Sequence, residues 1–316
     1  MENINEPGIY TDLLRELDRQ GHEVCVVCPR EKRFGKKTSF HNSESIKKLY
    51  VMTGNVTKTS YFEKGLAILL MPWQFLFTIT KHLNHIKFDL ILYSTPPITL
   101  VAVIKKLKKQ TKANTYLLLK DIWPQGIVDL GVIRAKGFIE QYFRKKEVEL
   151  YKVSDYIGCM SQANVDYVLK HNPFVKADRV EICPNSIEPL PLQKNVNKVK
   201  KIREKYGIPL GKIVFIYGGN LGKPQGIDFL MQCLQANEKN DEAFIIIAGS
   251  GTEFERLHNF INKESLKNTK LLNQIPKDDY EVLANTCDVG LIFLDRRFTI
   301  PNFPSRLLSY MQASMP

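Results

Sequence analysis

The feature that most constrains the fold of this chain is a series of short apolar runs that do not alternate with polar residues. A strand with one solvated face alternates apolar and polar side chains, whereas a strand that is apolar throughout is buried on both faces. Helix-like stretches such as 98–109 and 137–153 separate the runs. The pattern therefore predicts an α/β fold with parallel sheets that helices cover on both sides. The runs lie at 23–28, 89–93, 115–119, 156–160 and 180–183, and then at 212–217, 243–248, 269–272 and 289–294.

A change of composition divides the chain between these two series of strands. Prolines, lysines and asparagines are frequent from Pro184 to Pro209, and a length of 316 residues suits two domains. We predict two doubly wound Rossmann-like domains, 1–188 and 210–316, joined by a linker and a capping helix over 189–209. Ligands of such folds bind beyond the carboxyl ends of the strands, so the cleft between the domains is the expected site.

The charge balance indicates an anionic partner. The chain has 45 Lys and Arg against 33 Asp and Glu, a net charge of +12. This excess fits nucleic acid, an acidic membrane surface or a phosphorylated substrate. No helix-turn-helix, zinc-finger or aromatic-interleaved basic motif is present in the sequence, so we expect no nucleic-acid partner.

The cysteines do not indicate a disulfide framework or a metal site. Among the 6 cysteines, Cys25 and Cys28 form a C-x-x-C pair inside an apolar run, where side chains three residues apart face opposite sides of a strand. No second pair or histidine cluster completes a zinc site. We expect buried, reduced thiols in the cytoplasm and no metal. The first residues are acidic and polar, so we expect no signal peptide.

One segment raises the question of a membrane. No charged residue lies between Lys64 and Lys81. This stretch is shorter than the roughly 20 residues that span a bilayer, and Pro72 and Gln74 interrupt it. We expect a helix that does not span. Two interpretations stay open: a helix in the membrane interface anchored by Trp73 and its neighbouring phenylalanines, or a buried helix of a large core.

Two glycine-rich turns follow strands of the second domain. They run from Tyr217 to Gly226 and from Ala248 to Glu253, and each leads into a helix. Glycine lets the backbone approach a ligand, and amide groups at a helix N-terminus favour phosphate. Two such turns on successive strand–helix units favour a cradle for a nucleotide diphosphate. The alternative is that they serve only as tight turns. Neither matches the P-loop pattern.

These turns belong to a series of motifs, in order along nearly the whole chain, that resembles glycosyltransferase family 4, a family of retaining enzymes. The segment Asp121–Gln125, which reads Asp-Ile-Trp-Pro-Gln, resembles the subgroup that builds O-antigen, capsule and exopolysaccharide repeat units. The other matching segments are Asp12–Pro29, Val180–Ile187, Gly218–Gly226, Ile247–Gly251 and Pro304–Tyr310.

The resemblance implies a GT-B fold and transfer of a sugar, with retained configuration, from a nucleotide donor that is most often a UDP-sugar. It implies no bound metal and no other cofactor. It also implies an acceptor-side domain over 1–188 and a nucleotide-sugar-binding domain over 210–316. The implied acceptor is a polyprenyl-diphosphate-linked saccharide. We therefore expect a cytoplasmic enzyme held peripherally at the inner face of the plasma membrane, with basic residues of the first domain facing the anionic leaflet.

The chain departs from the family's common donor site at two pairs of positions. Many members place an Arg and a Lys on the first glycine turn, where this chain has Asn220 and Gln225, and paired glutamates where it has Pro301 and Ser309. We expect Arg306 to be the main cation for the phosphates; a surface salt bridge is its alternative role. The implied donor-binding residues are Gly218, Gly219, Asn220, Lys223, Gln225, Gly249, Gly251, Ile275, Ser305, Arg306 and Ser309.

The first domain carries the candidate catalytic residues. Lys120 and Asp121 follow a strand near the place where many family members have a cleft-lining His or Asp. We predict that Asp121, together with Lys120, orients the acceptor hydroxyl or the anomeric centre. Capping of the following turn is the alternative role of Asp121. Trp123 and Pro124 are predicted to form the acceptor wall by stacking on sugar or lipid.

The family's pattern extends beyond both ends of this chain. Seven residues precede Gly8, where the family has a first strand and a glycine-rich loop, and Pro316 falls before a further strand and helices. We therefore expect a fragment or a shortened product in which both domains are incomplete. A non-catalytic nucleotide-sugar-binding or scaffold protein of the same pathway is the alternative function, favoured by the neutral residues at the donor positions.

Overall fold

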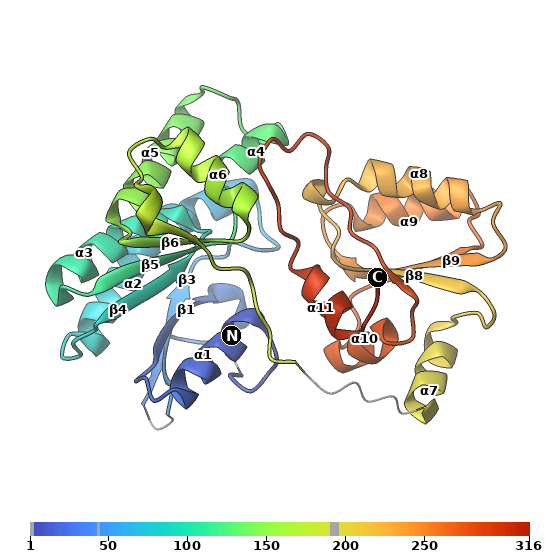
Figure 1. Cartoon of the computed structure of the whole chain (residues 1–316), viewed down its shortest axis with the longest axis horizontal. Coiled ribbons are helices and arrows are strands. Elements are labelled where there is room, and N and C mark those ends of the chain that lie inside the picture. Colours follow the sequence, from blue (N-terminus) through green and yellow to red (C-terminus); the bar gives the residue numbers. More distant parts are fainter. Residues whose placement is uncertain (1–2, 43–44, 190–195) are drawn as a thin grey trace. The chain divides into compact units, whose positions relative to one another are not determined.

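The structure is a computed structural model that describes residues 3–42, 45–189 and 196–316. The chain forms two compact units (Figure 1). Unit 1 comprises Met1–Glu188 and Thr299–Phe303, and unit 2 comprises Pro189–Phe298 and Pro304–Pro316. Of the predicted linker and capping helix, residues 190–195 lie outside the described residues, and α7 (Val196–Tyr206) is helical.

Unit 1 alternates helices and strands. Its strands form two sheets, with the orders β1-β3-β2 and β4-β5-β6-β7. All neighbouring strands are parallel except β2, which runs antiparallel to β3. The elements are α1 (Ile9–Arg19), β1 (Cys25–Glu31), η1 (Lys32–Phe34), β2 (Ser39–His41), β3 (Lys47–Thr53), α2 (Tyr61–Leu83), β4 (Leu90–Ser94), η2 (Ile98–Leu100), α3 (Val101–Thr111), β5 (Asn114–Leu119), α4 (Gln125–Asp129), α5 (Phe138–Val153), β6 (Tyr156–Cys159), α6 (Gln162–His171), η3 (Ala177–Arg179) and β7 (Val180–Ile182).

The first strand corrects the sequence prediction, which ended it before Pro29. β1 continues through Pro29, which pairs with Val51 of β3. β1 lies at an edge of its sheet as far as the chain is described, and an edge strand tolerates proline because half of its amide groups have no ladder partner. Cys28 is buried and Cys25 is partly buried, and burial raises the pKa of the Cys25 thiol to about 11.

The apolar segment near Lys64 forms α2, a longer helix than the uncharged stretch predicted. By length and composition, Phe62–Leu83 is the one described helix that could cross a membrane. Ser60 caps its N-terminus by accepting a hydrogen bond from the Glu63 amide at 3.2 Å. Pro72 lies inside the helix and has no N–H for the Ile68 carbonyl, which instead accepts a hydrogen bond from the Thr99 hydroxyl at 3.3 Å. The helix therefore continues through its proline.

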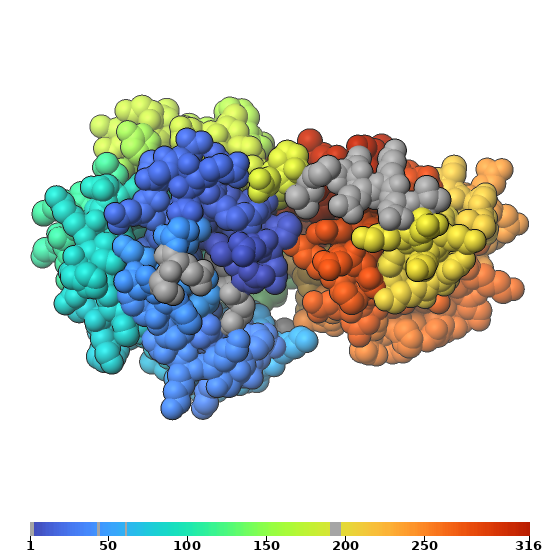
Figure 2. Space-filling view, turned by 90° about the horizontal axis from the view of Figure 1, so that it is seen from below, coloured from blue at the N-terminus to red at the C-terminus, as the bar shows by residue number. Residues whose placement is uncertain are grey.

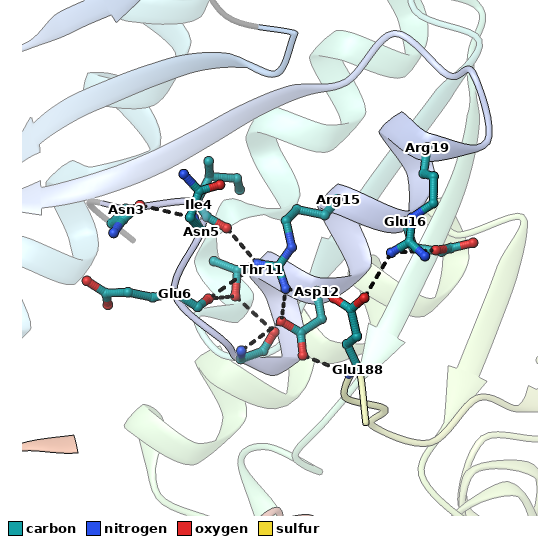
Figure 3. A network of polar contacts seen from close by, with 11 residues as sticks. Asn3, Ile4, Asn5, Glu6, Thr11, Asp12, Arg15, Glu16, Arg19 and Glu188 are labelled. Carbon is teal, nitrogen blue, oxygen red and sulfur yellow. Dashed lines mark hydrogen bonds and ion pairs between the residues drawn. The ribbon is translucent and has the colours of Figure 1, made fainter. Parts of the chain in front are cut away.

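A buried carboxylate ties the end of unit 1 to its first helix (Figure 3). Asp12 is 7% exposed and accepts hydrogen bonds from the amides of Gly8 and Glu188, both at 2.9 Å. Arg15 pairs with Asp12 at 2.8 Å and with the Glu188 carboxylate at 3.1 Å. Arg19 also contacts Glu188, at 3.3 Å. These bonds fix the chain at the point where unit 1 gives way to unit 2.

Unit 2 is built on one parallel sheet with the strand order β10-β9-β8-β11. Alternate residues of β8 belong to different cores, Val214 and Ile216 to one and Tyr217 to the other. Both faces are thus buried, as the apolar runs predicted. β11 is shorter than the predicted 289–294 strand. The elements are β8 (Ile213–Asn220), η4 (Lys223–Gln225), α8 (Ile227–Asn237), β9 (Ala243–Ser250), α9 (Phe254–Lys263), β10 (Thr269–Leu272), α10 (Lys277–Ala284), β11 (Val289–Gly290) and α11 (Arg306–Gln312). The predicted fold class, two Rossmann-like α/β domains, is confirmed.

Candidate functional site

Unit 2 holds a pocket at the carboxyl ends of its strands, with a volume of about 570 Å³. The ends of β8 and β9, the loop after β10, α10 and α11 all contribute to its wall. This edge is where the sheets of doubly wound folds bind ligands. The lining residues are Gly218, Gly219, Asn220, Ala248, Gly249, Ser250, Gln274, Ile275, Lys277, Tyr280, Ser305, Arg306 and Ser309.

The two glycine turns lie side by side because β8 and β9 are parallel neighbours. Gly219 is in register with Gly249. A Cβ on Gly249 would lie 1.8 Å from the carbonyl oxygen of Gly219, and Gly219 itself has φ of +125°. A side chain at 249 would collide with backbone, and the conformation at 219 is one that favours glycine. The glycines thus form tight, closely packed turns and also line the pocket, while a nucleotide diphosphate as the ligand of these turns stays a prediction.

A guanidinium closes the pocket on the side of α11. The Arg306 Cζ lies 4.2 Å from the centre of the Tyr217 ring. Its Nη2 lies 3.5 Å from the position that a Cβ of Gly219 would occupy. Its Nη1 is buried and, among the described residues, has no hydrogen-bond partner. A buried charged donor without an acceptor is costly, so this geometry indicates an anionic ligand in the pocket rather than a surface salt bridge.

Charge in the pocket has one sign. Lys277, at the start of α10, lines the wall together with Arg306, and no described lining residue is acidic. Tyr280 adds a phenol to the wall, and burial raises the pKa of this phenol, so it stays neutral at physiological pH. A wall with two cations, backbone amides and no carboxylate suits a phosphate-bearing ligand.

The first glycine turn is held together by its two neutral side chains. The Asn220 amide donates to the Gln225 Oε1 at 3.0 Å, and the Gly222 amide donates to the same oxygen at 3.1 Å. Asn220 lines the pocket, whereas Gln225 and Lys223 do not. Gly251, also predicted as donor-binding, does not line it either: a Cβ there would lie 2.2 Å from the Leu221 carbonyl oxygen.

The structure therefore brings most of the predicted donor residues together. Ile275, Ser305 and Ser309 line the pocket beside the glycines, Asn220 and Arg306. Pro301 is not a lining residue: it belongs to unit 1, where its carbonyl accepts a hydrogen bond from the Asn164 amide at 3.0 Å.

Sequence reasoning missed part of the wall. Gln274, Lys277 and Tyr280 come from the loop after β10 and the first turns of α10, which carry no glycine motif. The signal available in the sequence was position, because the carboxyl ends of neighbouring parallel strands meet at one edge. Asp278 and Asp279 also lie in the first turn of α10, and Asp279 pairs with Lys205 at 2.5 Å.

The candidate catalytic residues lie at the carboxyl end of β5 in unit 1. The Thr95 hydroxyl, from the end of β4, donates to the Asp121 carbonyl at 3.1 Å. The Asp121 side chain is solvent-accessible, but the surrounding protein atoms still desolvate its carboxylate and raise its pKa. Burial lowers the pKa of Lys120, against a smaller opposite influence of Cys183. Acid and base are therefore both shifted toward their neutral forms.

Trp123 and Pro124 follow directly. The Trp123 ring meets Phe143 of α5 edge to face, with centroids 5.7 Å apart. Pro124 is buried and precedes α4. At the end of α4, the Asp129 carboxylate accepts a hydrogen bond from the Thr299 amide at 2.7 Å. The predicted acceptor wall is thus a packed surface of unit 1.

Within 3–42, 45–189 and 196–316, no group of three or more His, Cys, Asp or Glu side chains is placed to hold a metal ion.

Comparisons with known proteins match both units. Residues 10–189 match the family model described as Glycosyltransferase Family 4, and residues 198–316 match the one described as Glycosyl transferases group 1. The chain is 22% identical over 323 residues to the probable glycosyltransferase WbjE of Pseudomonas aeruginosa, a match that covers 99% of this chain and 76% of that protein.

Solved structures share the fold. Anabaena Alr3699/HepE in complex with UDP-glucose has a TM-score of 0.63 at 15% identity, covering 100% of this chain and 78% of that one. WaaG, a glycosyltransferase involved in lipopolysaccharide biosynthesis, has a TM-score of 0.56 at 12% identity, covering 98% and 75%. At such identities the likeness shows the fold, which is the GT-B fold of glycosyltransferases.

Proposed function

Since this chain belongs to glycosyltransferase family 4, we propose that it transfers a sugar from a uridine-diphosphate donor to a lipid-linked saccharide during cell-surface polysaccharide synthesis. The donor binds in the pocket of unit 2. Transfer retains the anomeric configuration and uses no metal ion. The enzyme works at the inner face of the plasma membrane, on the cytoplasmic side.

The observation that carries the proposal is the Nη1 atom of Arg306, which is buried beside the two glycine turns and has no hydrogen-bond partner among the described residues. A diphosphate supplies the acceptor oxygens that this group lacks, and charge-assisted hydrogen bonds to phosphate are among the strongest in proteins. Lys277 adds a second positive charge on the same wall. UDP-glucose in the structurally similar HepE supports a uridine-diphosphate donor.

The chemistry follows from what these groups do as the sugar leaves. Negative charge develops on the departing diphosphate, and preorganised cations and amides stabilise it more strongly than they stabilise the intact donor. Arg306 and Lys277 take the place that a metal ion occupies in other transferases. Ser305 and Ser309, which also line the pocket, offer hydroxyl groups to the donor's ribose or sugar.

Unit 1 supplies the acceptor side in this proposal. Asp121 accepts a hydrogen bond from the acceptor hydroxyl and orients it, and its raised pKa makes it a better proton acceptor than an ordinary carboxylate. Lys120 lies beside it, and Trp123 with Pro124 forms the surface against which sugar or lipid packs. The excess of basic residues suits an anionic leaflet and a diphosphate-bearing lipid.

Calorimetric titration of the full chain with UDP and with a panel of UDP-sugars tests the donor site. Arg306→Ala is expected to weaken UDP binding by about 50-fold, because two or more charge-assisted hydrogen bonds are lost. Arg256→Ala is the matched control: this exposed arginine of unit 2 pairs with Glu253 at 3.2 Å and does not line the pocket. Equal UDP affinity in wild type and Arg306→Ala would overturn the proposed site.

A second function is favoured by the neutral donor positions. Neutral residues stand at four positions where many family members have charged groups, as expected of a protein that binds nucleotide sugars without transferring them: Asn220, Gln225, Pro301 and Ser309. Release of UDP from a donor in the presence of a bacterial lipid extract supports transfer. Tight UDP binding without release from any donor supports the non-catalytic function.

A further inference from the structure

Helix α2 has two apolar faces, and only one of them is used by the core. Ala67, Met71, Phe75, Ile79 and Leu83 are each at most 5% exposed. Most of this face packs in a core with β3 and α3. The other face carries six large apolar residues that are exposed, here called the α2 stripe: Phe62, Leu66, Leu69, Leu70, Trp73 and Phe77.

The α2 stripe is continuous along the helix. Its residues recur at intervals of three and four, which places them on one side of an α-helix. At 1.5 Å per residue the stripe is about 23 Å long. The two aromatic residues at its C-terminal half are the most accessible after Phe62, with Trp73 73% and Phe77 74% exposed. Exposed apolar stripes of this extent on soluble proteins mark interaction surfaces.

The neighbouring helix gives the stripe a charged border. α3 packs against α2, with Val103 and Leu107 in the same core. Its sequence, VAVIKKLKKQT, has four lysines and no acidic residue. Lys105 pairs with Glu149 at 3.0 Å, while Lys106, Lys109 and Lys112 are exposed. The light-blue to cyan segments that include α2 form part of the outer surface of unit 1 (Figure 2).

Contacts within unit 1 stabilise helix α2, so it does not need a partner in order to form. Ser60 caps it, Asn55 holds Glu63 of its first turn at 2.8 Å, and Thr99 satisfies the carbonyl left open by Pro72. The free energy of binding is therefore not spent on folding the helix.

We propose that the α2 stripe lies in the interface of an anionic phospholipid bilayer, with the lysines of α3 at the level of the headgroups. Apolar faces bordered by basic residues bind such surfaces in this way. The helix lies on the bilayer and does not cross it, because its other face is part of the core. A second copy of the chain fits less well, since pairing two such surfaces brings the α3 lysines together. This deepens the membrane association given under the proposed function and rests on it.

Flotation of the full chain with vesicles tests the stripe. Wild type is expected to float with vesicles of phosphatidylcholine and phosphatidylglycerol, and weakly with phosphatidylcholine alone. The double variant Trp73→Gln/Phe77→Gln is expected to bind about tenfold or more weakly. The control is Leu210→Gln, which removes an 85% exposed leucine of unit 2 and is expected to leave flotation unchanged. Equal loss in both variants would overturn the assignment.

Tryptophan fluorescence locates the contact. The chain has 2 tryptophans, Trp73 and Trp123, so Trp123→Phe leaves Trp73 as the reporter. Its emission is expected to shift to the blue with anionic vesicles and to be quenched by brominated lipid. An emission that stays unchanged while the protein floats would place the membrane contact elsewhere and contradict the proposal.

A charge variant completes the test. Lys106→Gln/Lys109→Gln is expected to weaken binding to the anionic vesicles by about fivefold per lysine, and less at high salt. Sedimentation without lipid tests whether a second copy of the chain covers the α2 stripe instead. A dimer that Trp73→Gln/Phe77→Gln abolishes, in a protein that does not bind vesicles, would overturn the proposal. UDP titration of the same variants separates the proposed donor site from the proposed membrane contact. UDP affinity is expected to be unchanged in variants that no longer float with vesicles.

Discussion

Each unit has a four-stranded parallel sheet, with the order β4-β5-β6-β7 in unit 1 and β10-β9-β8-β11 in unit 2, and the carboxyl ends of the two sheets differ in chemistry. In unit 2 the strands end in glycines beside Arg306, and the wall of the pocket is backbone and cation. In unit 1 the ends of β4 and β5 are followed by Thr95, Lys120 and Asp121, and the pKa values of Lys120 and Asp121 are both shifted toward the neutral form. In the function that we propose, the edge in unit 2 holds an anion with fixed amides and charges, and the edge in unit 1 presents groups that can exchange a proton.

The largest effect is expected from adding one methyl group where the two glycine turns of unit 2 are in backbone contact. Gly249→Ala places a Cβ against the Gly219 carbonyl. We expect loss of UDP binding and a decrease of about 3 kcal/mol in the free energy of unfolding of unit 2, measured by calorimetry and urea unfolding. Gly65→Ala in α2 is the control: nothing lies within 4 Å of its Cβ position, so stability is expected to stay equal or rise. Normal UDP binding by Gly249→Ala would contradict the interlocked turns.

Two aspartates at opposite ends of the unit 1 strands, Asp155 and Asp121, have pKa values that are shifted in opposite directions. Asp155 is partly buried, which opposes ionisation, but hydrogen bonds from Lys108 and Thr115 prevail and lower its pKa. Its stabilisation is thus present above the ordinary carboxyl pKa and is lost as the pH falls through the folded-state value. Asp155→Asn is expected to lower stability by about 1–2 kcal/mol at pH 7. The difference in melting temperature from wild type should shrink in acid.

Asp121 should behave in the opposite sense, because burial raises its pKa. The charged form then opposes folding at pH values above the ordinary carboxyl pKa. Asp121→Asn is expected to raise the melting temperature slightly at pH 7, and the gain should vanish below about pH 4, where the group is protonated in both states. Transfer activity is expected to fall at the same time. A destabilised Asp121→Asn at neutral pH would indicate that the residue only caps its turn.

The smallest effect is expected inside the first glycine turn. Gln225 bonds to Asn220 and to the Gly222 amide and does not line the pocket. Gln225→Ala should weaken UDP binding by no more than about threefold, because the two neutral hydrogen bonds that it removes hold the turn and do not contact the donor. Calorimetry measures this directly. A loss as large as that of Arg306→Ala would show that Gln225 contacts the donor itself.

Much of the fold could be predicted because the apolar runs are the strands. The exceptions have physical reasons. β3 was not predicted because it begins with Lys47 and Lys48, so it does not look like an apolar run. β1 was predicted to end before Pro29 because the sequence of a strand does not show that the strand lies at the edge of its sheet, where proline is tolerated. α2 extends past the charged residues that delimited it in the sequence, because its N-terminus is set by the Ser60 cap.

The site was predicted in part for a similar reason. Gly218, Gly219 and Gly249 of the glycine motifs, and Ser305 and Arg306, were predicted from the sequence and line the pocket. Lys277 and Tyr280 were not predicted, because it is the pairing of β9 with β10 that brings them to the pocket. Lys223, implied as donor-binding by the resemblance, does not line the pocket. No sequence pattern indicates that the Nη1 of Arg306 is buried without a hydrogen-bond partner among the described residues, because this depends on how α11 packs beside β8.

The backbone-to-backbone contact between Gly219 and Gly249 also limits how this pocket can be re-engineered. A side chain at 249 would collide with backbone and one at 219 would be strained, so neither glycine can be replaced to alter which nucleotide sugar is accepted. Variation has to come from other lining positions, among them Gln274, Ile275 and Ser309, which have side chains that can be replaced. A library confined to those three positions would retain the anion cradle while sampling different sugar preferences.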